Sequence, residues 1–283
     1  MKFDDKTFVL GIGAQKGGTS WLYKYLSGRD DIYMSPVKEM HYFDVKYRPD
    51  ICGPIEAGLN RKLKRMVEKA KEQKKQRERK KMDALRARID IGHDNTVYKE
   101  FFRSRVPEDV NFFGEITPSY SLVPEKGFRE IRALFPSIRV IFIMRDPVER
   151  FLSQVRMDQN SRQRKNGDAR DIVDFIKFHL ENRGSVERSS YQNVIANVDN
   201  AFESHEVIYL FYETLFRKET IQSLCNSIGL EYLEADFGRV VNSTGPREPV
   251  PADIWGKARM LFDPTYKFCR ERFGDALPKE WNI

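Results

Sequence analysis

The sequence has few of the residues that could crosslink it through disulfides or metal ions. Its 283 residues include three cysteines and four histidines. Cys52, Cys225 and Cys269 lie far apart and lack the CxxC or HxxxH spacing that zinc ligation needs. An odd number of widely spaced cysteines is typical of unpaired thiols in a reducing compartment. We therefore expect neither a disulfide framework nor a zinc site.

Long apolar runs are also missing. The first six residues are polar, and the apolar stretch from Phe8 to Ala14 is too short to cross a membrane or to act as a targeting segment. We expect no transmembrane segment and a soluble, cytoplasmic protein. Internal repeats and low-complexity linkers are absent too, which favours a single domain over residues 1–283. Nothing in the sequence specifies an oligomeric state.

The chain has an excess of positive charge, and one segment accounts for it. The net charge is +7, and between Arg61 and Arg88 there are 14 lysines and arginines against 4 acidic residues. The stretch from Lys71 to Lys81 has no apolar residue, which is typical of a solvated helix or arm. We interpret residues 50–95 as a basic helical insertion. Because nucleic-acid-binding proteins usually spread cationic contacts over the fold, we expect no nucleic-acid partner.

The rest of the chain alternates between predicted strands and helices. Apolar, β-branched stretches predict buried strands at 7–14, 111–116, 139–144 and 206–212. Helical spacing or start signals predict helices at 20–26, 125–135, 147–157, 171–181, 186–203, 214–228 and 253–273. This alternation predicts an α/β, P-loop-like three-layer fold, with a central parallel sheet flanked by helices.

The first motif with chemical meaning lies between the first strand and the first helix. Residues 13–20 (GAQKGGTS) nearly match the ATP-binding pattern G-x4-G-K-[ST], but Thr19 stands where that motif needs lysine, and Lys16 comes three residues earlier. The N–H groups of such a loop can bind an anion, with Lys16 as point charge and Thr19 and Ser20 as hydroxyl donors. The structural alternative is a turn that only starts a helix.

A second motif follows the strand at 139–144. Arg145 stands at the carboxyl end of that strand, where ligands of α/β sheets collect. Pro147 suits the first turn of a helix, which places Ser153 in its second turn. A fixed arginine and a hydroxyl suit a second phosphate, remote from the first. The alternative is a surface pair of Arg145 with Asp146 or Glu149.

Together the two motifs resemble the sulfotransferases that use 3′-phosphoadenosine 5′-phosphosulfate (PAPS) as donor and release PAP. In that family, the first loop holds the 5′-phosphosulfate and a later R-x7-S element holds the 3′-phosphate. The resemblance implies a 3′-phosphate site at Arg145 and Ser153. It implies a 5′ site made of Lys16, Gly17, Gly18, Thr19, Ser20 and Trp21.

A third segment resembles the heparan sulfate and bacterial branch of the family. Residues 38–44 (KEMHYFD) are similar to its KExHFFD-type segment, in which the glutamate is the proposed catalytic base. The resemblance implies Glu39 as general base, with His41 orienting it or sharing the work and Asp44 in a flanking position. Lys16 would stabilise the charge on the departing phosphate. For His41, a packed structural histidine is the alternative.

The chain also departs from that branch. Residues 114–120 (GEITPSY) are similar to its E-K-[ST]-P-x-Y segment, but Ile116 takes the place of a lysine, so heparan-type acceptor recognition is not carried over. The Lys-Gly cofactor loop is absent, and Arg247 is the expected substitute. The acceptor stays open between a saccharide, a lipid head group and a small metabolite. We see no acidic cluster suited to magnesium and expect no metal.

Two other functions compete with in-line sulfuryl transfer to a hydroxyl or amine. A P-loop kinase or NTPase would need a lysine after its glycines, and Thr19 argues against it. A non-catalytic polyanion-binding protein would use residues 61–88, with the glycine-rich loop as incidental structure. A third possibility combines the two, with the basic segment recruiting an anionic acceptor to a catalytic core.

Overall fold

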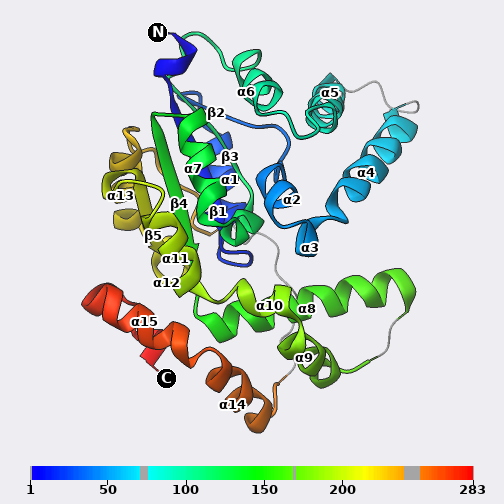
Figure 1. The fold of residues 1–283 in the computed structure, drawn as a ribbon, viewed down its shortest axis with the longest axis vertical. Coiled ribbons are helices and arrows are strands. Elements are labelled where there is room, and N and C mark those ends of the chain that lie inside the picture. The colour runs from blue at the N-terminus through cyan, green and yellow to red at the C-terminus, as the bar shows by residue number, and fades with distance from the viewer. Residues whose placement is uncertain (1, 71–75, 168–169, 239–248, 283) are drawn as a thin grey trace.

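The computed structural model describes residues 2–70, 76–167, 170–238 and 249–282. Within these ranges the core is a sheet of five strands, all parallel, in the order β2-β3-β1-β4-β5 (Figure 1). The strands are β1 (Thr7–Gly13), β2 (Ile32–Met34), β3 (Phe112–Ile116), β4 (Ile138–Met144) and β5 (Val207–Phe211). The prediction of a parallel α/β sheet is confirmed.

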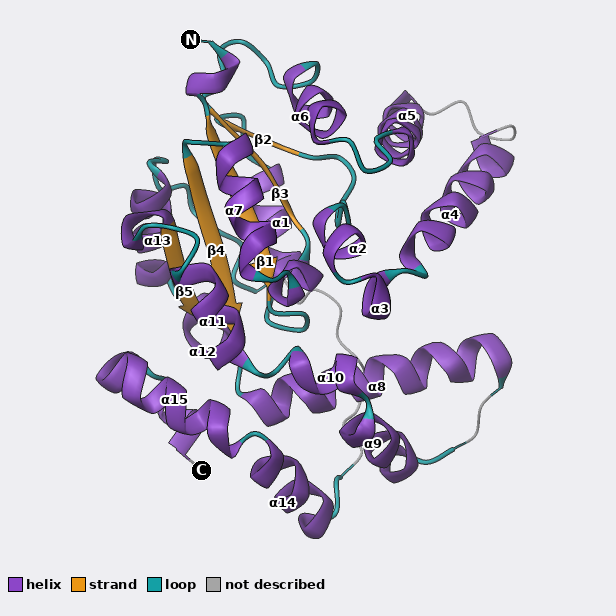
Figure 2. Cartoon of the chain, viewed as in Figure 1, coloured by secondary structure: helices purple, strands orange, loops and turns teal. Residues whose placement is uncertain are grey.

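Helices cover both faces of the sheet, which makes the fold three-layered (Figure 2). Side chains alternate along β1, so Phe8 and Leu10 join one buried cluster and Val9 joins another. Burial on both faces explains why β1 is continuously apolar. The helices are α1 (Thr19–Ser27), α2 (Phe43–Tyr47), α3 (Pro49–Cys52), α4 (Ile55–Ala70), α5 (Gln76–Asp90), α6 (Asn95–Arg103), α7 (Glu125–Leu134), α8 (Pro147–Asn166), α9 (Ile172–Glu181), α10 (Arg183–Glu187), α11 (Tyr191–Asp199), α12 (Tyr212–Leu215), α13 (Lys218–Ile228), α14 (Ala252–Leu261) and α15 (Asp263–Phe273).

Three predicted helices are each split in two. The region 186–203 contains the end of α10 and all of α11, 214–228 contains the end of α12 and α13, and 253–273 contains α14 and α15. Pro264 in the first turn of α15 has no N–H to continue the preceding helix, which explains the last break. The short strand β2 was not predicted, because three residues are too few to show a hydrophobic pattern that is typical of a strand.

Residues 50–95 are largely helical, with α3, α4 and α5 in this region. Arg79, Lys80 and Lys81 are exposed, as expected of a solvated segment, whereas 71–75 lie outside the described residues. The inner face of α5 is different, because Leu85 and Arg88 are buried there. The segment is therefore packed onto the main core along one side.

Two simple expectations can also be compared with the structure. Cys52, Cys225 and Cys269 are buried free thiols, as predicted. Among the described helices, none combines the length and the apolar content that a membrane crossing requires.

Candidate functional site

The glycine-rich loop folds tightly onto the carboxyl edge of the sheet. Ala14 donates its N–H to the carbonyl oxygen of Ile143 on β4 at 2.7 Å. Gly18 caps α1 with φ of 90°, in the left-handed region that glycine favours. A Cβ at Gly17 would lie 2.7 Å from the same Ile143 oxygen, and one at Gly18 would lie 2.7 Å from a methyl of Leu215. Both glycines are therefore required for the close approach of the loop to its neighbours.

Arg145 lies directly against this loop. It follows β4, is 8% exposed, and donates from Nη1 to the carbonyl oxygen of Lys16 at 3.4 Å. Its guanidinium also lies 4.7 Å from the ring centroid of Tyr212 and pairs with Glu149 at 3.0 Å. The pair with Glu149 was the structural alternative, and it coexists with the contact to the loop. Ser153 is buried on α8, the helix that Pro147 begins.

Buried positive charge accumulates around the loop. Burial lowers the pKa of Lys16, and the cations Arg145, Arg150 and Lys38 lower it further. Arg150 is fully buried, and burial, helped by Arg188 and Arg145, lowers its pKa to about 9. Like charges held together away from water repel one another and stay charged only at a cost. The arrangement therefore favours a bound anion, which would offset this repulsion.

A chain of polar contacts joins the loop to the 38–44 segment. Lys38 donates from Nζ to Oγ of Ser20 at 2.6 Å and pairs with Glu39 at 3.2 Å. On the other side of Glu39, Nε2 of His41 lies 3.4 Å from a carboxylate oxygen. Nδ1 of His41 lies 2.7 Å from the carboxylate of the fully buried Asp44. The structure thus brings together the predicted residues Ser20, Glu39 and His41.

The charges of Glu39 and His41 stabilise each other. Burial acts to raise the pKa of Glu39, but His41 and Lys38 outweigh it, so the pKa lies below its usual value. Burial acts to lower the pKa of His41, but Asp44 and Glu39 outweigh it and raise the pKa to about 9. At neutral pH, Glu39 is therefore a carboxylate and His41 an imidazolium.

Arg88 of α5 holds the backbone of this segment. Glu39 and His41 have φ of 63° and 52°, values that are uncommon outside glycine. Arg88 is 1% exposed; its Nε donates to the carbonyl oxygen of Met40, and its Nη2 donates to that of His41 at 2.7 Å. A residue of the basic segment therefore fixes the conformation of the segment that carries Glu39.

Glu115 of β3 also anchors this backbone. It is fully buried and accepts hydrogen bonds from the N–H of Met40 at 3.3 Å, the hydroxyl of Thr117 at 2.6 Å, and the hydroxyls of Tyr98 and Tyr120. Burial raises its pKa, while the hydrogen bonds from Thr117, Tyr98 and Tyr120 act in the opposite direction. Glu115 therefore has a structural environment, without exposure to a ligand.

We expect Arg88→Met to loosen the 39–42 backbone. Because the change removes two buried, charge-assisted hydrogen bonds, each worth roughly 1.5–3 kcal/mol, amide hydrogens of this segment should exchange at least about tenfold faster. The matched control is Arg86→Met, since Arg86 is exposed on the same helix. Equal exchange rates in the two variants, measured by mass spectrometry, would show that Arg88 does not hold the segment.

Two further predicted residues, Trp21 and Arg247, remain to be placed. Trp21 is 5% exposed and its ring packs against Tyr25 and Phe216, while Nε1 donates to the carbonyl oxygen of Asp236 at 3.2 Å. Trp21 therefore lies on the face of α1 that packs into the hydrophobic core. Arg247 lies outside the described residues.

Sequence reasoning missed several residues of this site. Lys38 stands next to Glu39 in a segment already selected, and Arg150 lies between Arg145 and Ser153. Both could have been found by asking which cations flank the motifs. Arg88 gave no such signal, because it is one of many arginines in a basic segment.

A parallel sheet with a glycine-rich loop and clustered cations at its carboxyl edge is typical of enzymes that bind nucleotide phosphates there. The sequence model described as "sulfotransferase family" matches residues 9–234, and the chain belongs to that family. Transfer of a sulfuryl group is therefore its general activity.

One solved structure agrees with this assignment at the level of the fold, and two others show a weaker likeness. A crystal structure of a sulfotransferase from Alicyclobacillus acidocaldarius superposes with a TM-score of 0.67 at 18% identity, covering 98% of each chain. The sulfotransferase domain from the curacin biosynthetic pathway gives a TM-score of 0.49 at 15% identity, covering 94% of this chain and 98% of that domain. The sulfotransferase domain of the Synechococcus PCC 7002 olefin synthase gives 0.48 at 14%, covering 92% and 94%. No curated protein sequence matches the chain.

Proposed function

We propose that the chain transfers the sulfuryl group of PAPS to a hydroxyl or amine acceptor by in-line displacement. The observation that carries the proposal is the group of cations at one edge of the sheet, where Arg145, Arg150 and Lys38 lower the pKa of Lys16 and Arg145 contacts the loop. PAPS carries anionic groups at both its 5′ and 3′ positions, so it suits a group of several cations. This match supports PAPS as the donor.

Each donor group has a proposed partner. The 5′-phosphosulfate would bind the loop, with Arg145 and Ser153 on the 3′-phosphate and Arg247 as a further cation. The proposed residues are Lys16, Gly17 and Gly18 of the loop and Thr19, Ser20 and Trp21 at the start of α1. Lys16 stands within the loop, next to the N–H groups that would bind the 5′-phosphosulfate. Its positive charge is therefore suited to stabilise the leaving phosphate.

Glu39 is the proposed general base. It removes the proton of the acceptor hydroxyl or amine while the acceptor atom bonds to sulfur. The bond from sulfur to the PAP oxygen breaks at the same time, and its electron pair stays on the phosphate. Because His41 is already protonated at neutral pH, it cannot accept this proton, and its role is to orient Glu39 and keep it ionised.

The pH dependence should report this pairing. Glu39 works as a base only when ionised, so activity is present above its folded pKa and is lost as the pH falls through that value. Since His41 lowers the pKa of Glu39, we expect His41→Gln to move the acid limb of kcat/KM to higher pH. His205→Gln, at an exposed histidine, is the control, and an unchanged profile in His41→Gln would contradict this role.

Calorimetry with PAP tests the donor assignment. We expect PAP to bind in the presence of EDTA, and to bind much more tightly than ATP with magnesium. Arg145→Met should weaken PAP binding by roughly tenfold or more, because it removes a charge-assisted contact worth about 1.5–3 kcal/mol. Binding of ATP that depends on magnesium, without binding of PAP, would instead support a P-loop kinase.

A further inference from the structure

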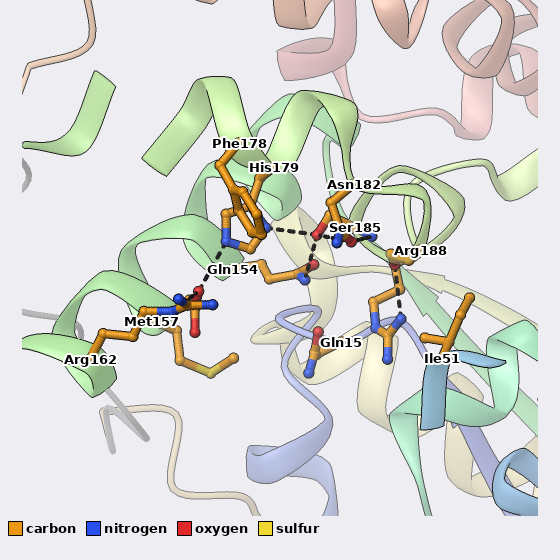
Figure 3. A pocket seen from close by; sticks show the side chains of 12 residues that line it. Gln15, Ile51, Gln154, Met157, Arg162, Phe178, His179, Asn182, Ser185 and Arg188 are labelled. Atoms are coloured by element: carbon orange, nitrogen blue, oxygen red, sulfur yellow. Dashed lines mark hydrogen bonds and ion pairs between the residues drawn. The ribbon is translucent and has the colours of Figure 1, made fainter. Parts of the chain in front are cut away.

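A pocket opens beside the glycine-rich loop, next to both proposed donor motifs. Its volume is about 270 Å³, and it lies between the loop, α3, α8, α9 and α10. Gln15, which precedes Lys16, and Gln154, which follows Ser153, both line it. Figure 3 shows Gln15 with Arg188 on one side and Met157 on the other. The pocket is therefore adjacent in the chain to both motifs.

Two buried polar groups in this pocket lack ordinary partners among the described residues. Arg188 is 8% exposed, and its Nη1 donates to the carbonyl oxygen of Gly184 at 2.8 Å. Its Nε has no oxygen or nitrogen partner in the described ranges, although the neutral Cys52 thiol lies close and the Asp44 carboxylate partly balances its charge. The side-chain oxygen of Gln15 is buried and also lacks a donor there. Burying such groups costs free energy unless a ligand or a water molecule supplies the missing hydrogen bond.

The polar wall on the far side is rigid and already satisfied. His179 bonds from Nδ1 to the hydroxyl of Ser185 at 2.7 Å and from Nε2 to Asp158 at 3.2 Å. The hydroxyl of Ser185 also lies 3.1 Å from the side-chain oxygen of Asn182. This network fixes the shape of the pocket, and Arg188 and Gln15 carry the buried polar atoms that have no partner among the described residues. Arg162, which lies 5.7 Å from the ring centroid of Phe178, is a further cation of the lining (Figure 3).

Apolar side chains form the mouth. Phe178 on α9 is 46% exposed and Met157 on α8 is 36% exposed, values that are high for large apolar residues. Exposed aromatic and thioether groups at the rim of a polar pocket suit the flat face of a ring. The volume is slightly below the roughly 300–1,000 Å³ of most small-molecule sites, so the pocket has room for a small ligand built on one ring.

A short path of contacts connects the pocket to the proposed base. Asp44 lies beside Arg188 and bonds to His41, and His41 pairs with Glu39. Arg188 is therefore linked through Asp44 and His41 to Glu39.

We infer that this pocket binds the sulfuryl acceptor, and that the acceptor is a small hydroxylated ring compound carrying a carboxylate or similar anion. Arg188 pairs with the anion, the side-chain oxygen of Gln15 accepts a hydrogen bond from a hydroxyl, and Phe178 and Met157 cover the ring. The inference rests on the proposed function, since it assigns the acceptor half of that reaction.

The test compares matched acceptors on the PAP-bound protein. The probes are D-glucuronate with D-glucose, and 4-hydroxybenzoate with phenol, studied by saturation-transfer NMR and by transfer of labelled sulfate from PAPS. We expect the anionic member of at least one pair to bind at least about tenfold more tightly, as for one charge-assisted contact. Arg188→Gln should abolish this preference, and Phe178→Ala should weaken binding of both members. The Kd of PAP should change less than about twofold in both variants.

Met260→Ala is the control, because Met260 is 71% exposed and does not line the pocket. Phe178→Ala keeps the test valid if Arg188→Gln fails to fold, since Phe178 lies at the surface. Equal binding of charged and neutral probes, or binding of none of them at millimolar concentration, overturns the inference while PAP binding leaves the donor assignment intact. Failure of the wild-type chain to bind PAP overturns the proposed function itself.

Discussion

Glu39→Gln is expected to lower the rate of sulfuryl transfer by roughly 10²- to 10⁴-fold, the usual contribution of a positioned general base. The amide has nearly the shape of the carboxylate but cannot accept the acceptor proton at neutral pH. Since the ion pairs of Glu39 in the described part of the chain are with Lys38 and His41, PAP binding should stay within about twofold of wild type.

The rate is measured with labelled PAPS, and the PAP affinity by calorimetry. Glu100→Gln, at an exposed glutamate on α6, is the matched control and should keep full activity. A variant that retains the wild-type rate would remove Glu39 from the role of base. Loss of PAP binding as well would indicate that the substitution disturbs the loop. A lower midpoint of thermal unfolding in the variant would then show that the fold is affected.

Lys16→Met should reduce kcat by roughly 10²- to 10³-fold, the effect seen when one preorganised donor to a developing oxyanion is removed. The change also removes a cation from a crowded group, because Arg145, Arg150 and Lys38 repel the Lys16 ammonium. We therefore expect stability to be retained or raised while the activity falls. Few substitutions of a structural lysine would have both effects.

Lys24→Met provides the comparison, because Lys24 is exposed on α1, away from the loop. Single-turnover rates and thermal unfolding midpoints are the two measurements. A loss of stability in Lys16→Met that accounts for the loss of activity would mean that Lys16 holds the loop together, and the role at the leaving phosphate would have to be abandoned.

Much of the fold could be predicted because buried strands have a strong sequence pattern. β1 and β4 are apolar on both faces, so their continuous runs are visible without a structure. Helix ends were less visible, since the breaks between α10 and α11 and between α12 and α13 coincide with no proline or glycine. The division of the chain into one domain over residues 1–283 stays a prediction.

The site was predictable where motifs are local in sequence. Lys16, Glu39 and Arg145 stand in three segments with recognisable spacing, and the fold brings these segments to one edge. Arg88 and Glu115 could not be assigned, because their partners are main-chain or buried groups far away in the chain. The buried atoms of Arg188 and Gln15 that lack a hydrogen-bond partner can be identified only when burial and hydrogen bonding are known.

The way in which the 39–42 segment is held has a consequence for redesign. Arg88 and Glu115 bond to main-chain atoms of this segment, and the N–H of Tyr42 bonds to the hydroxyl of Tyr120. These hydrogen bonds do not depend on the side chains at positions 39 and 41. Other reactive side chains could therefore be placed there without a change in the backbone conformation. Residues that tolerate positive φ, such as asparagine, aspartate and glycine, would be the easiest to install.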